Sequence, residues 1–285
     1  RYIEKIRAEG MDGSKAVETF EYLTTNIGPR LTNSPAHKQS IAWTQQQLKA
    51  WGMSEVHTEP FQFGRGWTLT KVSIEMVEPR YMPLIGYPRG WSPATSGRVV
   101  ATPVWIPGLE DAAMKAQAGK LKGAILFTSP IQEYAIRADR PAASGDLKPP
   151  SPAPASRPPQ LNGSLTGPNG EALAARLAFL KSEGVAVTIE PNIGEHGTVF
   201  VTGRDMGANA VPSIVLASEH YNLVAKMLQQ KMPVKLAVEI QATYNEEDRD
   251  THNVIWEIPG ADNAVKDEIV MVGAHLDSWH TATGA

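Results

Sequence analysis

Residues 269–279 read IVMVGAHLDSW, and this stretch decides the expected fold. Residues 269–274 form an unbroken apolar run, which is typical of a strand buried on both faces of a parallel or mixed sheet. The run leads directly into His275 and Asp277. Ligands of open α/β sheets bind beyond the carboxyl ends of the strands. The stretch therefore predicts an α/β fold with a site beginning at His275.

The pair His275 and Asp277 can serve a metal site or a purely structural purpose. Their spacing lets both side chains reach one space if the chain stays extended there. Imidazole is a good zinc ligand, and a nearby carboxylate can orient it or act on metal-bound water. The motif His-x-Asp is common, however, and two such side chains at a sheet end can simply hydrogen-bond each other or cap a helix. Because the chain has no cysteine, any metal must be held by His, Asp and Glu.

Before this stretch, the N-terminal part of the chain predicts two helices. Residues 14–27 repeat apolar side chains every three or four positions, as one face of a helix does. A second helix is expected to have Ser34 as its N-cap and Pro35 at its first position, and to end at Gly52. His37 is expected on the exposed side of this second helix. Two helices therefore precede the first strands.

Most of the remaining chain predicts short strands and loops. Strands are expected at 56–63, 71–77, 123–127, 184–189, 211–217, 234–244 and 253–258, and further helices at 171–182 and after Ser218. Residues 140–170 contain many prolines, and proline lacks the backbone N–H that a strand donates in a sheet. We interpret that segment as a surface loop or internal linker and expect it to be mobile.

Length and composition set the broad class. A chain of 285 residues has room for about two domains. The 27 Lys and Arg residues are outnumbered by 30 Asp and Glu residues and form no basic stripe, which disfavours a nucleic-acid partner. No apolar run is long enough to cross a bilayer. The chain begins at Arg1 without an initiator Met or an apolar signal segment, which suits a processed exported protein and equally a shortened piece. We expect an exported protein, periplasmic or secreted.

Two segments resemble the M28 family of metallopeptidases, in particular its carboxypeptidase Q-like group. One is His275 to Trp279 followed by the Gly-Ala pair at 284–285, and the other is the Ile-Gly-Pro-Arg-Leu segment at 27–31 ahead of the helix from Ser34. The region between them has the order and length of the protease-associated insert that many members carry. The resemblance implies a partial mixed-sheet α/β peptidase domain at 1–88 and 244–285, interrupted by a mostly β protease-associated domain at 89–243.

The resemblance also implies site residues and an activity. His275 matches a ligand of one zinc ion in a two-zinc site, and Asp277 matches the catalytic carboxylate that supports the site without binding metal directly. The family's bridging Asp, its Glu pair and its other ligands would all fall after Ala285. We therefore expect a zinc exopeptidase, of aminopeptidase or carboxypeptidase/dipeptidase type, that cleaves a terminal peptide bond with metal-activated water. The 285-residue chain alone, with one matched ligand, is expected to be inactive.

Other functions have weaker support. The chain lacks the Gly-x-Ser-x-Gly elbow of serine hydrolases and the Gly-x-Gly-x-x-Gly fingerprint of dinucleotide enzymes. The remaining alternative is a non-catalytic, peptidase-like scaffold whose inserted domain binds protein partners, since fold does not settle function. His280 has no counterpart in the family's motif and is expected to face solvent.

Overall fold

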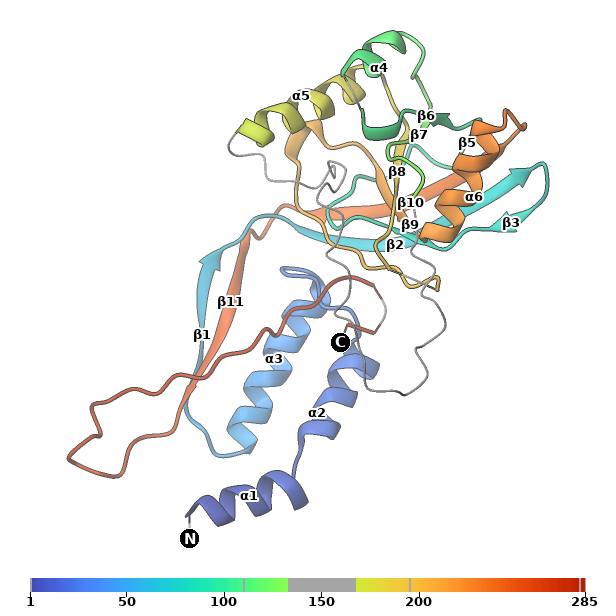
Figure 1. The fold of residues 1–285 in the computed structure, drawn as a ribbon. Coiled ribbons are helices and arrows are strands. Elements are labelled where there is room, and N and C mark those ends of the chain that lie inside the picture. Colours follow the sequence, from blue (N-terminus) through green and yellow to red (C-terminus); the bar gives the residue numbers. More distant parts are fainter. Residues whose placement is uncertain (1, 110, 133–167, 195, 282, 285) are drawn as a thin grey trace, which may run out of the picture. The chain divides into compact units, whose positions relative to one another are not determined.

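The computed structural model describes residues 2–109, 111–132, 168–194, 196–281 and 283–284 (Figure 1). These residues form two compact units. Unit 1 joins Arg1–Leu69 to Ala242–Ala285, and unit 2 is Thr70–Gln241. The predicted insert at 89–243 falls almost entirely within unit 2, and its assignment as a protease-associated domain stays a prediction. The predicted mobile segment at 140–170 lies largely outside the described residues.

Unit 1 is a group of helices beside a two-stranded antiparallel sheet. Its elements are α1 (Tyr2–Asp12), α2 (Ala16–Glu21), the π-helix η1 (Tyr22–Ile27), α3 (Pro35–Ala50), β1 (Ser54–Gln62) and β11 (Asp250–Glu257). Helix α3 contacts both strands and buries Ile41 and Leu48, which contributes roughly 2 kcal/mol for each side chain. The predicted start of α3 is confirmed, because the Ser34 Oγ accepts a hydrogen bond from the His37 N–H at 3.2 Å.

The predicted strand at 269–274 is wrong. Ile269, Val270, Met271 and Val272 expose 87%, 92%, 87% and 76% of their surface, and no described strand pairs with them. A buried strand needs partners for its backbone N–H and C=O groups. In the described part of unit 1, the two strands β1 and β11 pair with each other instead. The apolar pattern measures the side chains' preference for burial and says nothing about a neighbouring strand.

Unit 2 is built from two sheets, one of which is mainly parallel. The first has the order β3-β2-β10-β5, with β2 (Gly66–Glu78), β3 (Met82–Pro83), β5 (Val99–Ala101) and β10 (Lys235–Asn245). The second has the order β4-β9-β8-β7-β6, with β4 (Gly86–Pro88), β6 (Val104–Trp105), β7 (Ile125–Phe127), β8 (Val187–Pro191) and β9 (Ser213–Leu216). Strands β6 to β9 run parallel and β4 antiparallel. The mixed α/β class is confirmed.

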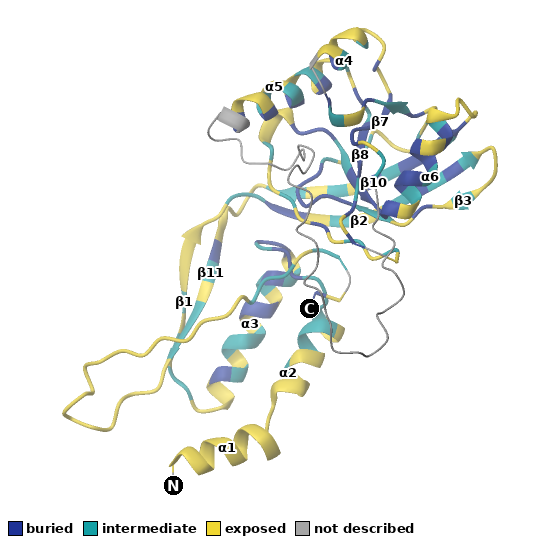
Figure 2. Ribbon diagram, viewed as in Figure 1, coloured by how far each residue is buried: buried dark blue, intermediate teal, exposed yellow. Residues whose placement is uncertain are grey.

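Helices cover the second sheet and close the core of unit 2. They are α4 (Asp111–Ala116), α5 (Pro168–Ser182) and α6 (Ser218–Gln229), with short 3₁₀ turns η2 (Pro107–Leu109) and η3 (Gly207–Asn209). One core cluster joins Leu173, Leu177 and Leu180 of α5 to Leu121 and Leu126. Figure 2 shows buried residues gathered in the strands and in α6, whereas α1 of unit 1 is exposed throughout.

The predicted pattern of β10 is confirmed for most of its length. Leu236, Val238 and Ile240 each expose at most 1% of their surface, and Gln241 on the opposite face is exposed. Ala237 is also buried, although it lies between the partly exposed Lys235 and Glu239 on the wet face. None of the helices in the described ranges combines the length and apolar character that a bilayer crossing requires.

Candidate functional site

The structure brings His275 and Asp277 together in unit 1. The His275 Nδ1 lies 2.8 Å from the Asp277 Oδ1, which is hydrogen-bonding distance. The two side chains differ in environment, since His275 exposes 93% of its side chain and Asp277 only 27%. The carboxylate is therefore the anchored member of the pair, and the imidazole projects from it toward solvent.

Asp277 is anchored by Thr32, a residue that the sequence did not single out. The Thr32 hydroxyl donates a short hydrogen bond to the Asp277 Oδ2, so both carboxylate oxygens have partners. Burial alone would raise the pKa of the Asp277 carboxyl. The hydrogen bonds from Thr32 and His275, together with the nearby charge of His275, outweigh burial and hold this pKa below its ordinary value. Asp277 is consequently an ionised acceptor at neutral pH.

Arg30 connects the segment around Asp277 to the segment at η1 by hydrogen bonds to backbone carbonyls. Its Nε donates to the Leu276 carbonyl at 3.0 Å, and its two terminal nitrogens donate to the carbonyls of Leu23 and Gly28, both at 2.8 Å, and of Gly284 at 2.7 Å. The side chain is almost fully buried. Burial lowers the pKa of Arg30, and the charge of Asp277 opposes this effect, but a guanidinium stays protonated in proteins.

His37 is buried, so its predicted exposure was wrong. Its Nδ1 accepts a hydrogen bond from the Asn33 N–H at 3.1 Å and lies 3.2 Å from the Thr251 Oγ1. Burial lowers the pKa of His37, a shift that the charge of Asp277 partly opposes. Asn33 adopts a φ of 61°, which folds the entry of the helix back on itself. The periodicity of a helix cannot reveal this turn.

His280 was also predicted to face solvent, and this prediction was wrong. Its ring meets Trp67 edge-on, with 5.0 Å between the ring centroids and 82° between the ring planes. Trp67 is buried to 1% of its surface, so the contact is part of the packing of unit 1. Edge-to-face pairs of this kind favour a fixed ring orientation. His280 is a packing residue rather than a mobile surface histidine.

Comparison with known proteins shows what the chain resembles. No family model matches the chain. Carboxypeptidase Q from Bos taurus is 21% identical over 276 residues, and carboxypeptidase Q from Homo sapiens is 23% identical over 278; each alignment covers 97% of this chain and 52% of the relative. The chain thus spans about half the length of the curated relatives it matches. A crystal structure of a peptidase M28 precursor from Shewanella amazonensis SB2B has a TM-score of 0.64, with 23% identity over 99% of this chain and 59% of that one.

The chain resembles carboxypeptidase Q in sequence and a peptidase M28 precursor in fold. The resemblance predicted from the segments at 27–31 and 275–279 is thereby confirmed. The structural likeness, at this level of identity, concerns the fold, and it agrees with the mixed α/β class. The site residues of this chain still rest on its own geometry.

That geometry suits one metal ligand with its supporting carboxylate. Metal-binding histidines commonly donate their second ring N–H to a carboxylate, which fixes the tautomer and leaves the other nitrogen for the metal. The His275 Nδ1 and Asp277 have this relationship, so the exposed Nε2 is the atom that could bind zinc. Within the ranges that the structure describes, no group of three or more His, Cys, Asp and Glu side chains is arranged to hold a metal ion.

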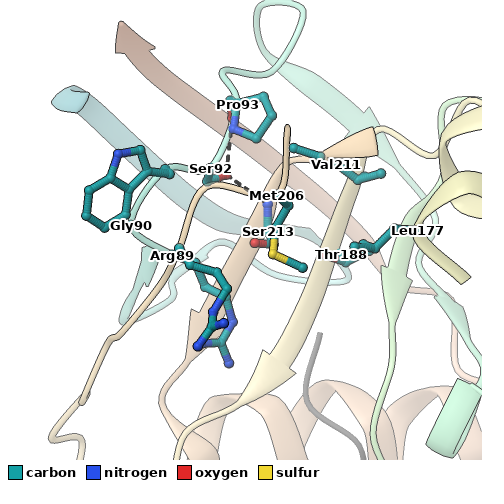
Figure 3. A pocket seen from close by; sticks show the side chains of 12 residues that line it. Arg89, Gly90, Ser92, Pro93, Leu177, Thr188, Met206, Val211 and Ser213 are labelled. Carbon is teal, nitrogen blue, oxygen red and sulfur yellow. Dashed lines mark hydrogen bonds between the residues drawn. The ribbon is translucent and has the colours of Figure 1, made fainter. Parts of the chain in front are cut away.

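The structure also contains two hollows, one in each unit. The first, in unit 2, has about 20 Å³ of space beside Arg89, Ser92 and Ser213 (Figure 3), which is room for about one water molecule. The second is an open groove of about 370 Å³ in unit 1, lined by the stacked rings of Tyr22 and Trp43. Neither lining includes His275 or Asp277. At the candidate site itself, the His275 imidazole is exposed and the Asp277 carboxylate is half-buried.

Proposed function

We propose that this chain contributes to a zinc-dependent exopeptidase, with His275 as a metal ligand and Asp277 as the carboxylate that supports the catalytic site. The observation that carries the proposal is the 2.8 Å contact between the His275 Nδ1 and an Asp277 carboxylate that Thr32 anchors. Similarity to carboxypeptidase Q along nearly the whole chain supports the same activity. The substrate is a peptide, and the bond that is cut is a terminal one.

The residues of this chain have defined tasks in such a site. Asp277 accepts a hydrogen bond from the His275 Nδ1–H, which leaves the lone pair of the Nε2 available for a metal. Thr32 keeps the carboxylate in place, and the lowered pKa of Asp277 keeps it ionised at neutral pH. A bound zinc ion supplies Lewis acidity for the hydrolysis of the peptide bond. The family resemblance implies two ions, and this number is part of the proposal.

The proposal includes the expectation that the 285-residue chain alone is inactive. His275 is one ligand, and the described residues do not assemble a second and third around it. Zinc sites of hydrolases use three protein ligands and an open position. The chain by itself should bind zinc weakly, and the remaining ligands should come from residues other than those described. The same observation favours a second candidate, a peptidase-like scaffold whose unit 2 binds protein partners.

Measurement of zinc content and turnover in the full gene product separates the two candidates. Substrates should include an aminoacyl anilide and dipeptides blocked at either end, which also identifies the end that is attacked. We expect His275→Ala to lose both zinc and turnover. His57→Ala is the matched control, because His57 is an exposed histidine of the same unit, held by the Glu55 carbonyl. Full activity in His275→Ala would remove the proposed role of His275, whereas absence of zinc and of turnover in the unmutated gene product would leave the scaffold. Export of the gene product is a further expectation that cell fractionation tests.

A further inference from the structure

We infer that Arg30 is the positioning residue of the His275–Asp277 pair. Its guanidinium holds the backbone on either side of Asp277 against the turn that follows η1. The inference rests on the proposed function only where zinc affinity is concerned, because the orientation of His275 can be measured without metal or substrate. Arg30 touches neither imidazole nor carboxylate in the hydrogen bonds described above, so it acts through the backbone.

The hydrogen bonds of Arg30 join two parts of the chain that are far apart in sequence. Leu23 lies in η1 and Gly28 follows its last residue, whereas Leu276 and Gly284 belong to the segment that carries the site. Carbonyls at the end of a helix attract a cation, because the helix dipole is negative there. One guanidinium therefore bridges a helix end and the site segment, and its planar fork suits several carbonyls at once.

The backbone of Arg30 adds a second attachment at the residue after Asp277. The Arg30 N–H donates to the Ser278 Oγ at 2.9 Å, and the Ser278 N–H donates to the Arg30 carbonyl at 3.0 Å. Leu276 and Ser278, which flank Asp277, are thus both held by one residue. Asp277 in turn holds His275 through its Oδ1. Displacement of Arg30 would shift Asp277 away from Thr32 and release the imidazole.

The backbone of Gly284, which Arg30 binds, packs closely against residues 28 and 29. A Cβ atom on Gly284 would lie 2.7 Å from the Gly28 carbonyl oxygen and 2.8 Å from the Pro29 Cα, so only glycine fits at this close approach. A buried cation is costly unless its donors are satisfied. The donors of Arg30 are satisfied by carbonyls of both segments, so its burial is stable only when the site segment is docked. Arg30 therefore fixes the position of the segment that carries the site, in addition to stabilising the fold.

The test follows the tautomer of His275 by nuclear magnetic resonance of the 285-residue chain with ¹⁵N-labelled histidine. At about pH 8, above the ordinary pKa range of histidine, the contact with Asp277 predicts that His275 carries its proton on Nδ1. Arg30→Met should lose this preference, and Arg30→Lys should lose much of it, because an ammonium cannot reach four carbonyls in a plane. In the full gene product, the affinity of both Arg30 variants for cobalt or zinc, measured by titration, should fall about 10 to 100-fold, as it does when residues that hold metal ligands in place are removed.

Arg89→Met is the matched control. Arg89 is a second buried arginine, paired with Glu190 in unit 2, so its loss should lower stability and leave the His275 tautomer unchanged. The signal of the buried His37 reports whether unit 1 is folded. If Arg30→Met and Arg30→Lys keep the His37 signal, the Nδ1–H tautomer of His275 and the metal affinity, the inference is overturned.

The remaining outcomes are also decisive. If neither Arg30 variant folds, the network supports the whole unit rather than the site, and the inference is likewise overturned. Full retention of the tautomer in Arg30→Lys would overturn the role of the planar guanidinium, whereas a preference between those of the wild type and Arg30→Met would support it. A changed tautomer together with full turnover in His275→Ala would keep this inference and remove the proposed function, so the two can fail separately.

Discussion

Replacement of Thr32 by valine tests the anchoring of Asp277 most directly. Valine has nearly the shape of threonine but no hydroxyl, so the change removes the hydrogen bond to the Asp277 Oδ2 and leaves the packing in place. The carboxylate keeps its contact with His275 and loses its link to the segment ahead of α3. Both the stability of unit 1 and the orientation of the imidazole should respond.

The expected loss can be worked out from the contact. A hydrogen bond to a charged acceptor contributes about 1.5–3 kcal/mol when it is buried. Because Asp277 exposes 27% of its side chain, water can replace part of the lost hydrogen bond, and the lower end of this range applies. We expect Thr32→Val to lower the free energy of unfolding by about 1.5 kcal/mol at pH 7, which corresponds to roughly a tenfold change in the unfolding equilibrium.

The dependence on pH identifies the origin of this loss. The pKa of Asp277 is lowered in the folded state from its ordinary value of 3.8. A group of this kind contributes stability above its unfolded pKa, and the contribution disappears as the pH falls through the lower folded value. The difference between wild type and Thr32→Val should therefore be full at pH 7 and shrink below about pH 4. Urea unfolding at a series of pH values measures it.

Thr24→Val provides the matched control for this experiment. The Thr24 hydroxyl donates to the Phe20 carbonyl at 2.8 Å within the same unit, and no carboxylate takes part. Its removal should change the free energy of unfolding by at most about 1 kcal/mol, independently of pH. If Thr32→Val shows the same cost at pH 7 and at pH 3, or no more than Thr24→Val, then Thr32 does not anchor an ionised Asp277.

Two further predictions concern single charged groups. Asp277→Asn keeps the volume of the side chain but loses its charge, so the full gene product should retain part of its zinc and lose about 10 to 100-fold in turnover; unchanged turnover alongside wild-type zinc content would contradict the supporting role. Arg89→Met leaves Glu190 buried without its partner, and unit 2 should lose about 3–5 kcal/mol of stability; urea unfolding should show recovery when Glu190→Gln is added, and a loss below 1 kcal/mol would show that the pair is dispensable.

The sequence by itself determined the features that depend on near neighbours. Ser34 and Pro35 start α3 because capping needs only the next three residues, and the alternation of β10 reports one buried face within a single strand. The mixed α/β class follows from such local signals, taken together. A spacing of two likewise limits how far apart the side chains of His275 and Asp277 can be, and their assignment to a metal site stays a prediction.

Tertiary structure alone decided which distant groups surround that pair. Thr32 is 245 positions from Asp277, and Arg30 is 246 positions from Leu276, so no local pattern links them. His37 and His280 were misjudged for the same reason, because burial depends on the segments that fold over a side chain. The apolar run at 269–274 shows the opposite case, in which the side chains favour a strand and no described strand pairs with it. Hydrogen-bond partners and packing neighbours are set by the path of the whole chain, and a sequence pattern contains only the preferences of its own residues.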